Sequence, residues 1–303
     1  MTQAFAPGIY PRSEALVQAT RDLDRGRTTQ AAVEEEVARD LEQLVEAQQA
    51  AGLDLLSDGL LRWQDVFRPV IEATEGLETG PLTRFLDTNT FYRAPSGTTA
   101  TPKLSTPLDE RYVAPLPGPR LVTLPSPSAL ARGTGIAVKT LAEAVLKPQL
   151  EATEAELAVL AEPFLADDRN ELDELAEALD ALAGSGPPLA LQITFGDARE
   201  LLEAGLAELP VEGIGIDFYK THLTDVPERL DKLLLAGVVD ARSSVLEEPR
   251  ELAAFAERLR NERGVERIAL TPNGDLQYVS QPIAQAKLAR LGKARTATTE
   301  AAA

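Results

Sequence analysis

The chain has 303 residues but no cysteine and only one histidine, His222. The absence of cysteine excludes disulfides, catalytic thiols and every metal site built from thiolates. A single histidine cannot complete a metal site that needs several imidazoles. We interpret His222, which follows a predicted strand close to Lys220, as a surface residue, with proton transfer as the alternative.

Basic residues and long hydrophobic runs are also scarce. There are 30 Lys and Arg against 48 Asp and Glu, which gives a net charge of −18. This surplus repels nucleic acids and anionic membranes, so we expect the chain to bind neither. The longest clean apolar run, residues 233–239, is far too short to span a bilayer, and the N-terminus has no basic and apolar leader. We therefore expect a cytoplasmic protein that acts on a small-molecule substrate.

Short apolar runs alternate with amphipathic helical stretches, which is typical of a parallel α/β sheet. Eight runs predict strands, at residues 4–10, 53–58, 120–124, 157–161, 189–193, 213–217, 234–240 and 267–271. Helices are predicted at residues 29–51, 171–183 and 248–260. Eight alternations close most simply into a (β/α)8 TIM barrel, as one domain over residues 1–293. Residues 294–303 have little to bury, and we expect a disordered tail.

A proline-rich insertion, residues 66–119, lies in the βα-loop after the second predicted strand. Loops at that end of a barrel carry function more often than loops at the other end. Within the insertion, the sequence TRFLDTNTFYRAP gathers Arg84, Asp87, Asn89 and Tyr92 beside two phenylalanines. This mixture suits a planar polar ligand stacked on aromatic rings, while an ordinary β-hairpin whose aromatics cover the barrel is the alternative.

Polar residues follow most of the predicted strands, and in a barrel these positions converge on one face. They are Tyr10, Arg12, Asp58, Ser126, Glu162, Thr194, Asp217, Tyr219, Asp240, Arg242, Asn273 and Asp275, and Trp63 and Asp65 follow closely after the second strand. Several carboxylates on one rim need cations, protons or a ligand between them. We predict Glu162 and Asp217 as catalytic residues, and the substrate contacts as Arg12, Asp58, Trp63, Asp65, Arg84, Asp87, Asn89, Tyr92, Asp240, Arg242 and Asn273. For each residue, an internal ion pair or a helix cap is the alternative.

Six motifs, in order along the chain, resemble the cobalamin-independent methionine synthase family, especially its short single-barrel members. They are GIYPRS at 8–13, AGLDLLSDGLLRWQD at 51–65, RFLDTNTFYRAP at 84–95, LAEPFL at 160–165, GVVDARSSVLEEP at 237–249 and LTPNGDLQY at 270–278. The resemblance implies a (β/α)8 barrel and methyl transfer from a methylated donor, folate or another, to the thiol of homocysteine. In that family a zinc ion held by histidine, two cysteines and a glutamate activates the thiol.

The same resemblance places the zinc ligands on residues that mostly cannot bind the metal. The histidine and the first cysteine fall at about Thr194 and Gly196, the second cysteine at Gly274, and the glutamate near Asp217. A lone carboxylate does not hold zinc tightly in water, so we expect no zinc site.

Three hypotheses stay open. The first is a methionine synthase-type methyltransferase homologue that works on a methylated donor without zinc. The second is a non-catalytic paralogue that serves as a scaffold or subunit for an active homologue, because a barrel can keep its fold after losing its chemistry. The third is an enzyme of another reaction, with Glu162, Asp217 and Asp240 as acids and bases.

Overall fold

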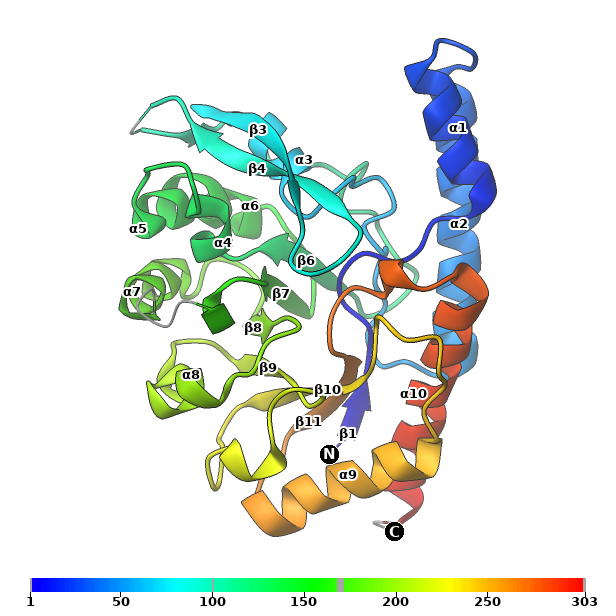
Figure 1. Ribbon diagram of the computed structural model, residues 1–303, viewed down its shortest axis with the longest axis vertical. Helices are drawn as coiled ribbons and strands as arrows, with labels where there is room; N and C mark the ends of the chain where they lie inside the picture. The colour runs from blue at the N-terminus through cyan, green and yellow to red at the C-terminus, as the bar shows by residue number, and fades with distance from the viewer. Residues whose placement is uncertain (1, 100, 168–171, 302–303) are drawn as a thin grey trace.

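The computed structural model describes residues 2–99, 101–167 and 172–301. Seven parallel strands form one curled sheet in the order β1-β11-β10-β9-β8-β7-β6 (Figure 1). They are β1 (Thr2–Ala4), β6 (Leu121–Pro125), β7 (Leu157–Glu162), β8 (Leu189–Ile193), β9 (Gly213–Asp217), β10 (Leu233–Val239) and β11 (Ile268–Pro272). The protein therefore has an α/β fold that is TIM-barrel-like, which confirms the predicted class.

The predicted strand at residues 53–58 is wrong as a regular strand. It contributes an isolated parallel bridge between Leu56 and Arg120. The Asp54 N–H donates to the Ala4 carbonyl at 2.9 Å, and the Leu121 N–H donates to the Leu56 carbonyl at 2.9 Å, so the segment lies between β1 and β6. Its pairing with β1 is irregular because the Asp54 carboxylate itself accepts the Ala4 N–H at 2.8 Å.

Strand β1 is shorter than the predicted run at residues 4–10. Beyond Ala4, the Phe5 N–H still donates to the Leu270 carbonyl at 3.3 Å. The Gly8 N–H then donates to Thr123 Oγ1 on β6 at 3.0 Å. The chain after Phe5 thus leaves the ladder and crosses toward the opposite side of the sheet.

Helices cover the outer face of the sheet on two flanks. On one flank α1 (Glu14–Asp24), α2 (Gln30–Ala51), α9 (Pro249–Arg263) and α10 (Gln281–Ala301) pack against one another (Figure 1). The other flank carries α4 (Pro127–Ala131), α5 (Val138–Leu141), α6 (Lys147–Glu151), α7 (Leu172–Leu182) and α8 (Arg199–Glu203). These positions confirm the predicted helices at residues 29–51 and 248–260, and the one at 171–183 from Leu172 onward.

The end of the chain differs from the expected disordered tail, because α10 runs on through Ala301. Ala294 is fully buried, and Arg295 forms an ion pair with Asp54 in which Nη2 and Oδ1 are 2.7 Å apart. Gly292 allows this packing, since a Cβ at that position would lie 1.7 Å from the Ala51 carbonyl oxygen. The missing side chain lets α10 approach the end of α2 closely, a contact that alanine-rich composition does not reveal.

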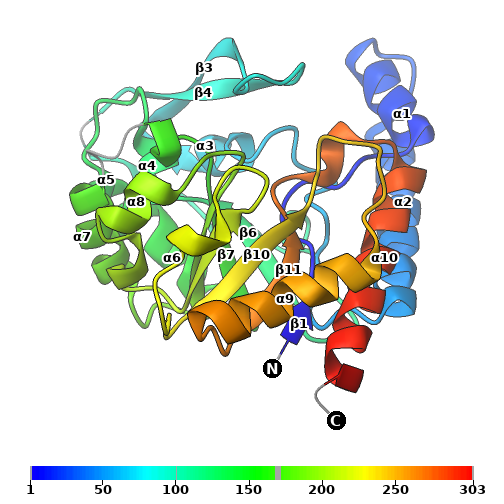
Figure 2. The same cartoon turned by 60° about the horizontal axis from the view of Figure 1, so that its bottom comes forward.

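The insertion folds into small elements above the strand ends. They are α3 (Arg68–Glu72), β2 (Thr74–Glu75), β3 (Leu77–Arg84), β4 (Phe91–Gly97) and β5 (Lys103–Leu104). Strands β3 and β4 form an antiparallel hairpin in which Arg84 lies opposite Phe91. Figure 2 shows this hairpin lying above the parallel strands. The hairpin alternative for residues 83–95 is the structure observed.

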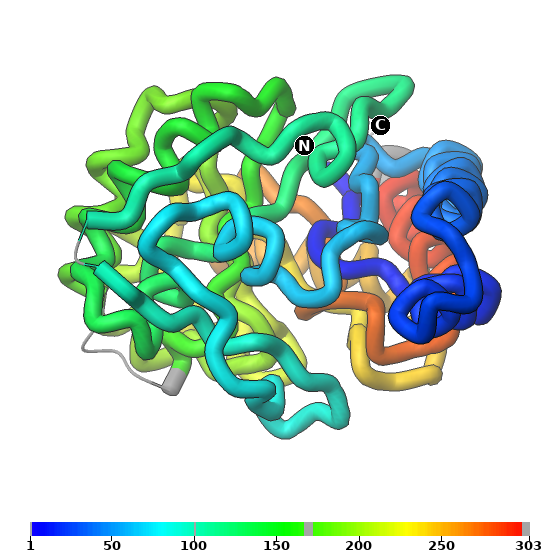
Figure 3. Tube along the Cα trace, turned by 90° about the horizontal axis from the view of Figure 1, so that it is seen from above, coloured from blue at the N-terminus to red at the C-terminus, as the bar shows by residue number. Residues whose placement is uncertain are grey.

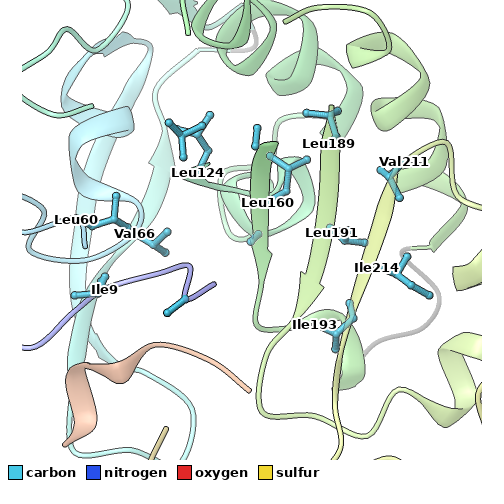
Figure 4. Packing of buried hydrophobic residues seen from close by; sticks show 14 of the residues in the cluster. Ile9, Leu60, Val66, Leu124, Leu160, Leu189, Leu191, Ile193, Val211 and Ile214 are labelled. Carbon is cyan, nitrogen blue, oxygen red and sulfur yellow. The ribbon is translucent and has the colours of Figure 1, made fainter. Parts of the chain in front are cut away.

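Two apolar layers hold the fold together. The outer layer, part of which Figure 4 shows, places Leu124, Leu160, Leu191 and Ile214 in one register row across β6 to β9, all at most 1% exposed. A separate inner cluster consists of Phe5, Leu55, Leu121, Leu157, Val159, Ala190, Leu233, Leu235 and Ala269. The inner cluster contains Leu55, so the irregular segment at residues 53–58 still fills the interior.

Within the described residues, no helix is long and apolar enough to cross a membrane.

Candidate functional site

Asp217 and Asn273 form the centre of the strand-end rim. Asn273 Nδ2 donates to Asp217 Oδ1 at 3.1 Å, and the Tyr219 N–H donates to the same oxygen at 2.8 Å. Asn273 is held in place because its Oδ1 accepts the Ala241 N–H at 2.9 Å. Within the described structure the other carboxylate oxygen, Asp217 Oδ2, is buried and has no hydrogen-bond partner. Burial raises the pKa of Asp217 to about 6, against the lowering effect of its two hydrogen bonds and of Arg242.

Two of the positions that the family resemblance assigned to zinc ligands, Thr194 and Gly274, lie together at this rim. A Cβ on Gly274 would lie 2.7 Å from Thr194 Cγ2 and 2.4 Å from Phe195 Cζ. Gly274 follows Asn273, the partner of Asp217. The Phe195 ring therefore fills the space beside Gly274, and it also packs edge-on against Tyr278 with ring centroids 5.5 Å apart.

Phe195 has a backbone φ of 57°, in the left-handed region that side chains other than glycine rarely adopt. Such a conformation costs on the order of 1 kcal/mol and persists only where the surroundings impose it. The residue was not among the predicted contacts. No sequence pattern marks a strained backbone at a phenylalanine, so pattern analysis could not have found it.

Arg242 connects the rim to the tip of the hairpin. Its guanidinium lies over the Phe195 ring, with Cζ 4.5 Å from the centroid, and Nη1 donates to Asp87 Oδ1 at 2.5 Å. Asp87 is 80% exposed at the hairpin turn. Arg242 thus contacts Phe195 and Asp87 and lies close enough to Asp217 to lower its pKa. Its predicted role as a substrate contact stays a prediction.

Glu162, at the end of β7, is buried and makes the contacts of a capping residue. One carboxylate oxygen accepts the N–H groups of Phe164 and Leu165 at 2.9 and 3.1 Å. The other accepts the hydroxyl of Ser126. These hydrogen bonds hold the carboxylate against the loop that follows β7. This is the alternative given for each predicted site residue, a cap of the next helical turn. The predicted catalytic role of Glu162 stays a prediction.

A buried ion pair fixes the loop that carries Asp240 and Arg242. Lys287 of α10 is fully buried, and its Nζ donates to Glu247 Oε1 at 2.9 Å and to the Val245 carbonyl at 2.7 Å. Glu247 Oε1 also accepts the Asp240 N–H at 2.8 Å. The sequence analysis did not predict this pair. A signal was present, because Lys287 lies on the same helix face as Ala284, Leu288 and Leu291, and a lysine on an apolar helix face indicates a buried charge that needs a partner.

The hairpin residues have separate roles. Tyr92 is 8% exposed and lies in an aromatic cluster, with its ring 5.3 Å from Phe67 and 5.9 Å from Phe164. Arg84 closes the turn, because Nε donates to the Thr88 carbonyl at 2.5 Å. Asn89 is exposed at the turn. Tyr92 thus belongs to the cover of the strand ends, and Arg84 to the turn itself.

The remaining predicted contacts lie to one side of the rim and are engaged with backbone groups. Asp58 accepts the N–H groups of Leu60 and Ala114 at 3.0 and 3.2 Å, and burial raises its pKa. Asp65 Oδ1 accepts the N–H of Phe67 at 2.9 Å, and its Oδ2 accepts the N–H of Arg93 at 3.1 Å. These two carboxylates therefore anchor the insertion.

Trp63 and Arg12 lie together beyond these carboxylates. Trp63 is 1% exposed, and its Nε1 donates to the Tyr112 carbonyl at 2.9 Å. Arg12 Nη2 donates to the Trp63 carbonyl. The predicted set therefore divides into a rim group around Asp217 and a lateral group around Arg12.

A small cavity lies under the hairpin. Its volume is about 20 Å³, and Phe67, Phe85, Tyr92 and Asp275 form part of its lining. Asp275 Oδ1 accepts the Ile9 N–H at 3.0 Å, and burial raises the pKa of Asp275 to about 6. This volume holds no more than a water molecule, since small-molecule sites occupy roughly 300–1,000 Å³.

The donor atoms at the rim do not fit the family's zinc ion. Within residues 2–99, 101–167 and 172–301, no group of three or more His, Cys, Asp or Glu side chains could hold a metal. At the positions that the resemblance assigns to the ligands, a hydroxyl and two glycines stand in place of one nitrogen and two sulfur donors, and the carboxylate of Asp217 stands in place of the glutamate.

Comparison with known proteins relates the sequence and the fold of this chain to one family. A family model described as the N-terminal domain of cobalamin-independent synthase matches residues 137–263. The 5-methyltetrahydropteroyltriglutamate–homocysteine methyltransferase of Mycolicibacterium paratuberculosis is 29% identical over 288 residues, which cover 80% of this chain and 38% of that protein. The enzyme of the same name from Mycobacterium tuberculosis is 30% identical over 288 residues, covering 78% of this chain and 37% of that protein.

The chain belongs to the cobalamin-independent methionine synthase family. This member spans less than two fifths of the length of those two relatives. Its fold resembles a B12-independent methionine synthase from Shewanella sp. W3-18-1, with a TM-score of 0.72 at 15% identity, covering 100% of this chain and 98% of the other. A putative vitamin-B12-independent methionine synthase from Listeria monocytogenes gives a TM-score of 0.71 at 14% identity, covering 98% of each chain.

Proposed function

We propose that this family member is a methionine synthase-type methyltransferase homologue. Its barrel-like sheet, with residues 53–58 as the eighth part of a (β/α)8 barrel, would bring together a small methylated donor and a homocysteine-like thiol in the cytoplasm, without zinc. The observation that carries the proposal is Asp217, whose buried Oδ2 has no hydrogen-bond partner among the described residues and whose Oδ1 accepts from Asn273, the neighbour of Gly274. The names of the relatives make 5-methyltetrahydropteroyltriglutamate and homocysteine the first substrates to test.

The chemistry at this rim would rest on one base and one cation. Asp217 Oδ2 accepts the proton of the thiol, and the guanidinium of Arg242 stabilises the thiolate electrostatically. A pKa of about 6 suits a carboxylate to this exchange better than an ordinary aspartate. The sulfur–methyl bond forms as the nitrogen–methyl bond of the donor breaks, the electron pair stays on that nitrogen, and the nitrogen takes up a proton.

Access of a substrate to Asp217 would require a local opening, because Asp217 Oδ2 is buried. The Arg242–Asp87 ion pair joins the hairpin turn to the rim, and Asp87 is largely exposed. Exposed ion pairs contribute about 0–1 kcal/mol, so this contact can break at little cost. Opening would expose Arg242 and Asp217 together.

The test uses the full chain with methyl-labelled 5-methyltetrahydropteroyltriglutamate and homocysteine, and mass spectrometry of labelled methionine. We expect methionine to form and Asp217→Asn to reduce its rate by about 100-fold or more, the usual contribution of a general base. The control is Asp231→Asn, since Asp231 is exposed. Equal rates in both variants would remove Asp217 from the mechanism.

The second candidate is a non-catalytic paralogue that acts as a scaffold or subunit for an active homologue. The substitution of three ligand positions by Thr194, Gly196 and Gly274 favours it, together with the Phe195 ring that fills the space beside Gly274. In that case neither the donor nor homocysteine raises the melting temperature, because only a ligand that binds the folded state stabilises it. Co-purification with a zinc-containing homologue would support this candidate over the first.

A further inference from the structure

Glu247, in the loop between β10 and α9, accepts hydrogen bonds from three separate parts of the fold. Its Oε1 accepts from Lys287 Nζ of α10 at 2.9 Å, from the Asp240 N–H after β10 at 2.8 Å, and from the Tyr219 hydroxyl after β9 at 3.2 Å. Its Oε2 accepts from Lys287 Nζ at 3.0 Å. Figure 3 shows this loop, in gold, beside the orange segment that leads into α10. The carboxylate therefore connects two strand ends to one helix.

Lys287 holds this carboxylate in place. The Lys287 side chain is fully buried, and that of Glu247 is 10% exposed. The Lys287 ammonium also donates to the Val245 carbonyl at 2.7 Å, in the same loop. An ammonium group only donates and an ionised carboxylate only accepts, so the two groups satisfy each other and the loop together. A buried ion pair of this kind is stable only when further hydrogen bonds satisfy its remaining atoms, as they do here.

One chain of hydrogen bonds leads from Glu247 to Asp217. The Tyr219 hydroxyl lies 3.2 Å from Glu247 Oε1 and 3.3 Å from the Val238 carbonyl oxygen. The hydroxyl has one proton to donate, and the charged acceptor forms the stronger hydrogen bond. The backbone N–H of Tyr219 donates to Asp217 Oδ1 at 2.8 Å. Tyr219 is thus held by Glu247 at its hydroxyl and contacts Asp217 through its backbone.

A second chain of hydrogen bonds leads from Glu247 to Arg242. The Asp240 N–H donates to Glu247, and Asp240 Oδ1 accepts the Arg242 N–H at 2.9 Å. Between these two residues, the Ala241 N–H donates to Asn273 Oδ1 at 2.9 Å. The loop that carries Arg242 is therefore tied to Glu247 on one side and, on the other, to the asparagine that contacts Asp217.

We propose that Glu247, with Lys287 as its counterion, is a positioning residue that sets the placement of Asp217 relative to Arg242. The inference rests on the proposed methyl transfer, in which Asp217 and Arg242 act on the same thiol. Glu247 and Lys287 act through the two chains of hydrogen bonds and not by contact with the substrate. Placement matters because a displacement of about 1 Å can reduce a rate by about 100-fold.

The test compares two variants with the unmodified full chain. Tyr219→Phe removes only the hydroxyl of a side chain that is 49% exposed, so the fold should persist. The double variant Glu247→Gln with Lys287→Met removes both buried charges, because removal of one alone leaves the other uncompensated. The matched control combines Glu251→Gln with Lys293→Met, since both residues are exposed, on α9 and α10.

Hydrogen exchange at single amides, followed by nuclear magnetic resonance, measures this placement without a substrate. We expect exchange of the Tyr219 N–H to rise about fivefold in Tyr219→Phe through the loss of one hydrogen bond. In the double variant the Tyr219 and Arg242 amides should both exchange faster, while amides of β7 keep their rate, which separates a local effect from general destabilisation. Unchanged exchange at both amides in the double variant overturns the proposal. If that variant does not fold, unchanged exchange at Tyr219 in Tyr219→Phe overturns it.

The rate of labelled methionine formation then tests whether the placement matters to the reaction. We expect kcat to fall about tenfold in both variants and KM to change less than about twofold, because misplacement weakens the transition state more than substrate binding. The control should keep both constants. Unchanged kcat in both variants overturns the proposal, since the ion pair would then only support the loop. If the unmodified chain forms no methionine, the proposed function fails, and the exchange rates still decide whether Glu247 sets the two positions.

Discussion

Replacing Asp217 by asparagine should change how stability depends on pH. The folded pKa is about 6 against 3.8 for a free aspartate, so the folded state binds the proton more tightly than the unfolded state. Below about pH 4 the carboxyl is neutral in both states and does not lower the unfolding free energy. As pH rises to about 7, ionisation of the buried carboxyl lowers the unfolding free energy progressively. A shift of about two pKa units corresponds to roughly 3 kcal/mol.

The Asp217→Asn variant has no charge to bury, and its side-chain oxygen can still accept from Tyr219 and Asn273. Relative to the unmodified protein, it should therefore gain roughly 3 kcal/mol of unfolding free energy between about pH 4 and pH 7.5. Asp275, which has a similarly raised pKa, is present in both proteins and cancels in the difference.

Urea unfolding followed by tryptophan fluorescence suits this measurement, because Trp63 is the only tryptophan and is 1% exposed. Asp231→Asn, which alters an exposed aspartate, controls for the loss of one negative charge. A difference between Asp217→Asn and the unmodified protein that stays constant with pH would show that Asp217 titrates normally in the folded state, contrary to this prediction.

Three further substitutions test the contacts around the rim. Lys287→Met should cost about 3–5 kcal/mol in urea unfolding because it leaves buried Glu247 unpaired, and adding Glu247→Gln should restore part of the loss. Tyr92→Ala should cost about 3–5 kcal/mol through lost aromatic packing, whereas Tyr92→Phe should cost less than about 1.5 kcal/mol; equal losses would contradict a packing role. Arg242→Gln should increase hydrogen exchange in residues 85–90 about fivefold, and unchanged exchange would show that the ion pair with Asp87 does not hold the hairpin.

The sequence predicted most of the strands because each is a short apolar run bounded by turn residues. It failed at residues 53–58, where an equally apolar run forms only one bridge. The difference lies in the side chain of Asp54, which takes a hydrogen bond from the Ala4 backbone and an ion pair from Arg295. Both partners are distant in sequence, so no local pattern could show them. The tail was misjudged for the same reason, because its helix depends on packing against α2.

The sequence predicted where the candidate site lies, but not which hydrogen-bond partners its side chains find. Strand-end logic found Asp217, Asn273 and Arg242, because the carboxyl ends of parallel strands share one edge. It could not separate them from Asp58 and Asp65, which also follow a strand but accept backbone N–H groups of the insertion. Which partners a carboxylate finds is decided by loops, and loop conformation depends on contacts across the fold.

Zinc content decides whether this chain has an altered site, in which Asp217 is the one carboxylate at the ligand positions and Phe195 fills the space beside Gly274. The full chain would be purified with added zinc, passed through a desalting column, and measured by elemental analysis against its protein concentration. We expect far less than one zinc per chain. One zinc per chain, lost in Asp217→Asn, would contradict it and would restore the zinc-dependent activation of a thiol.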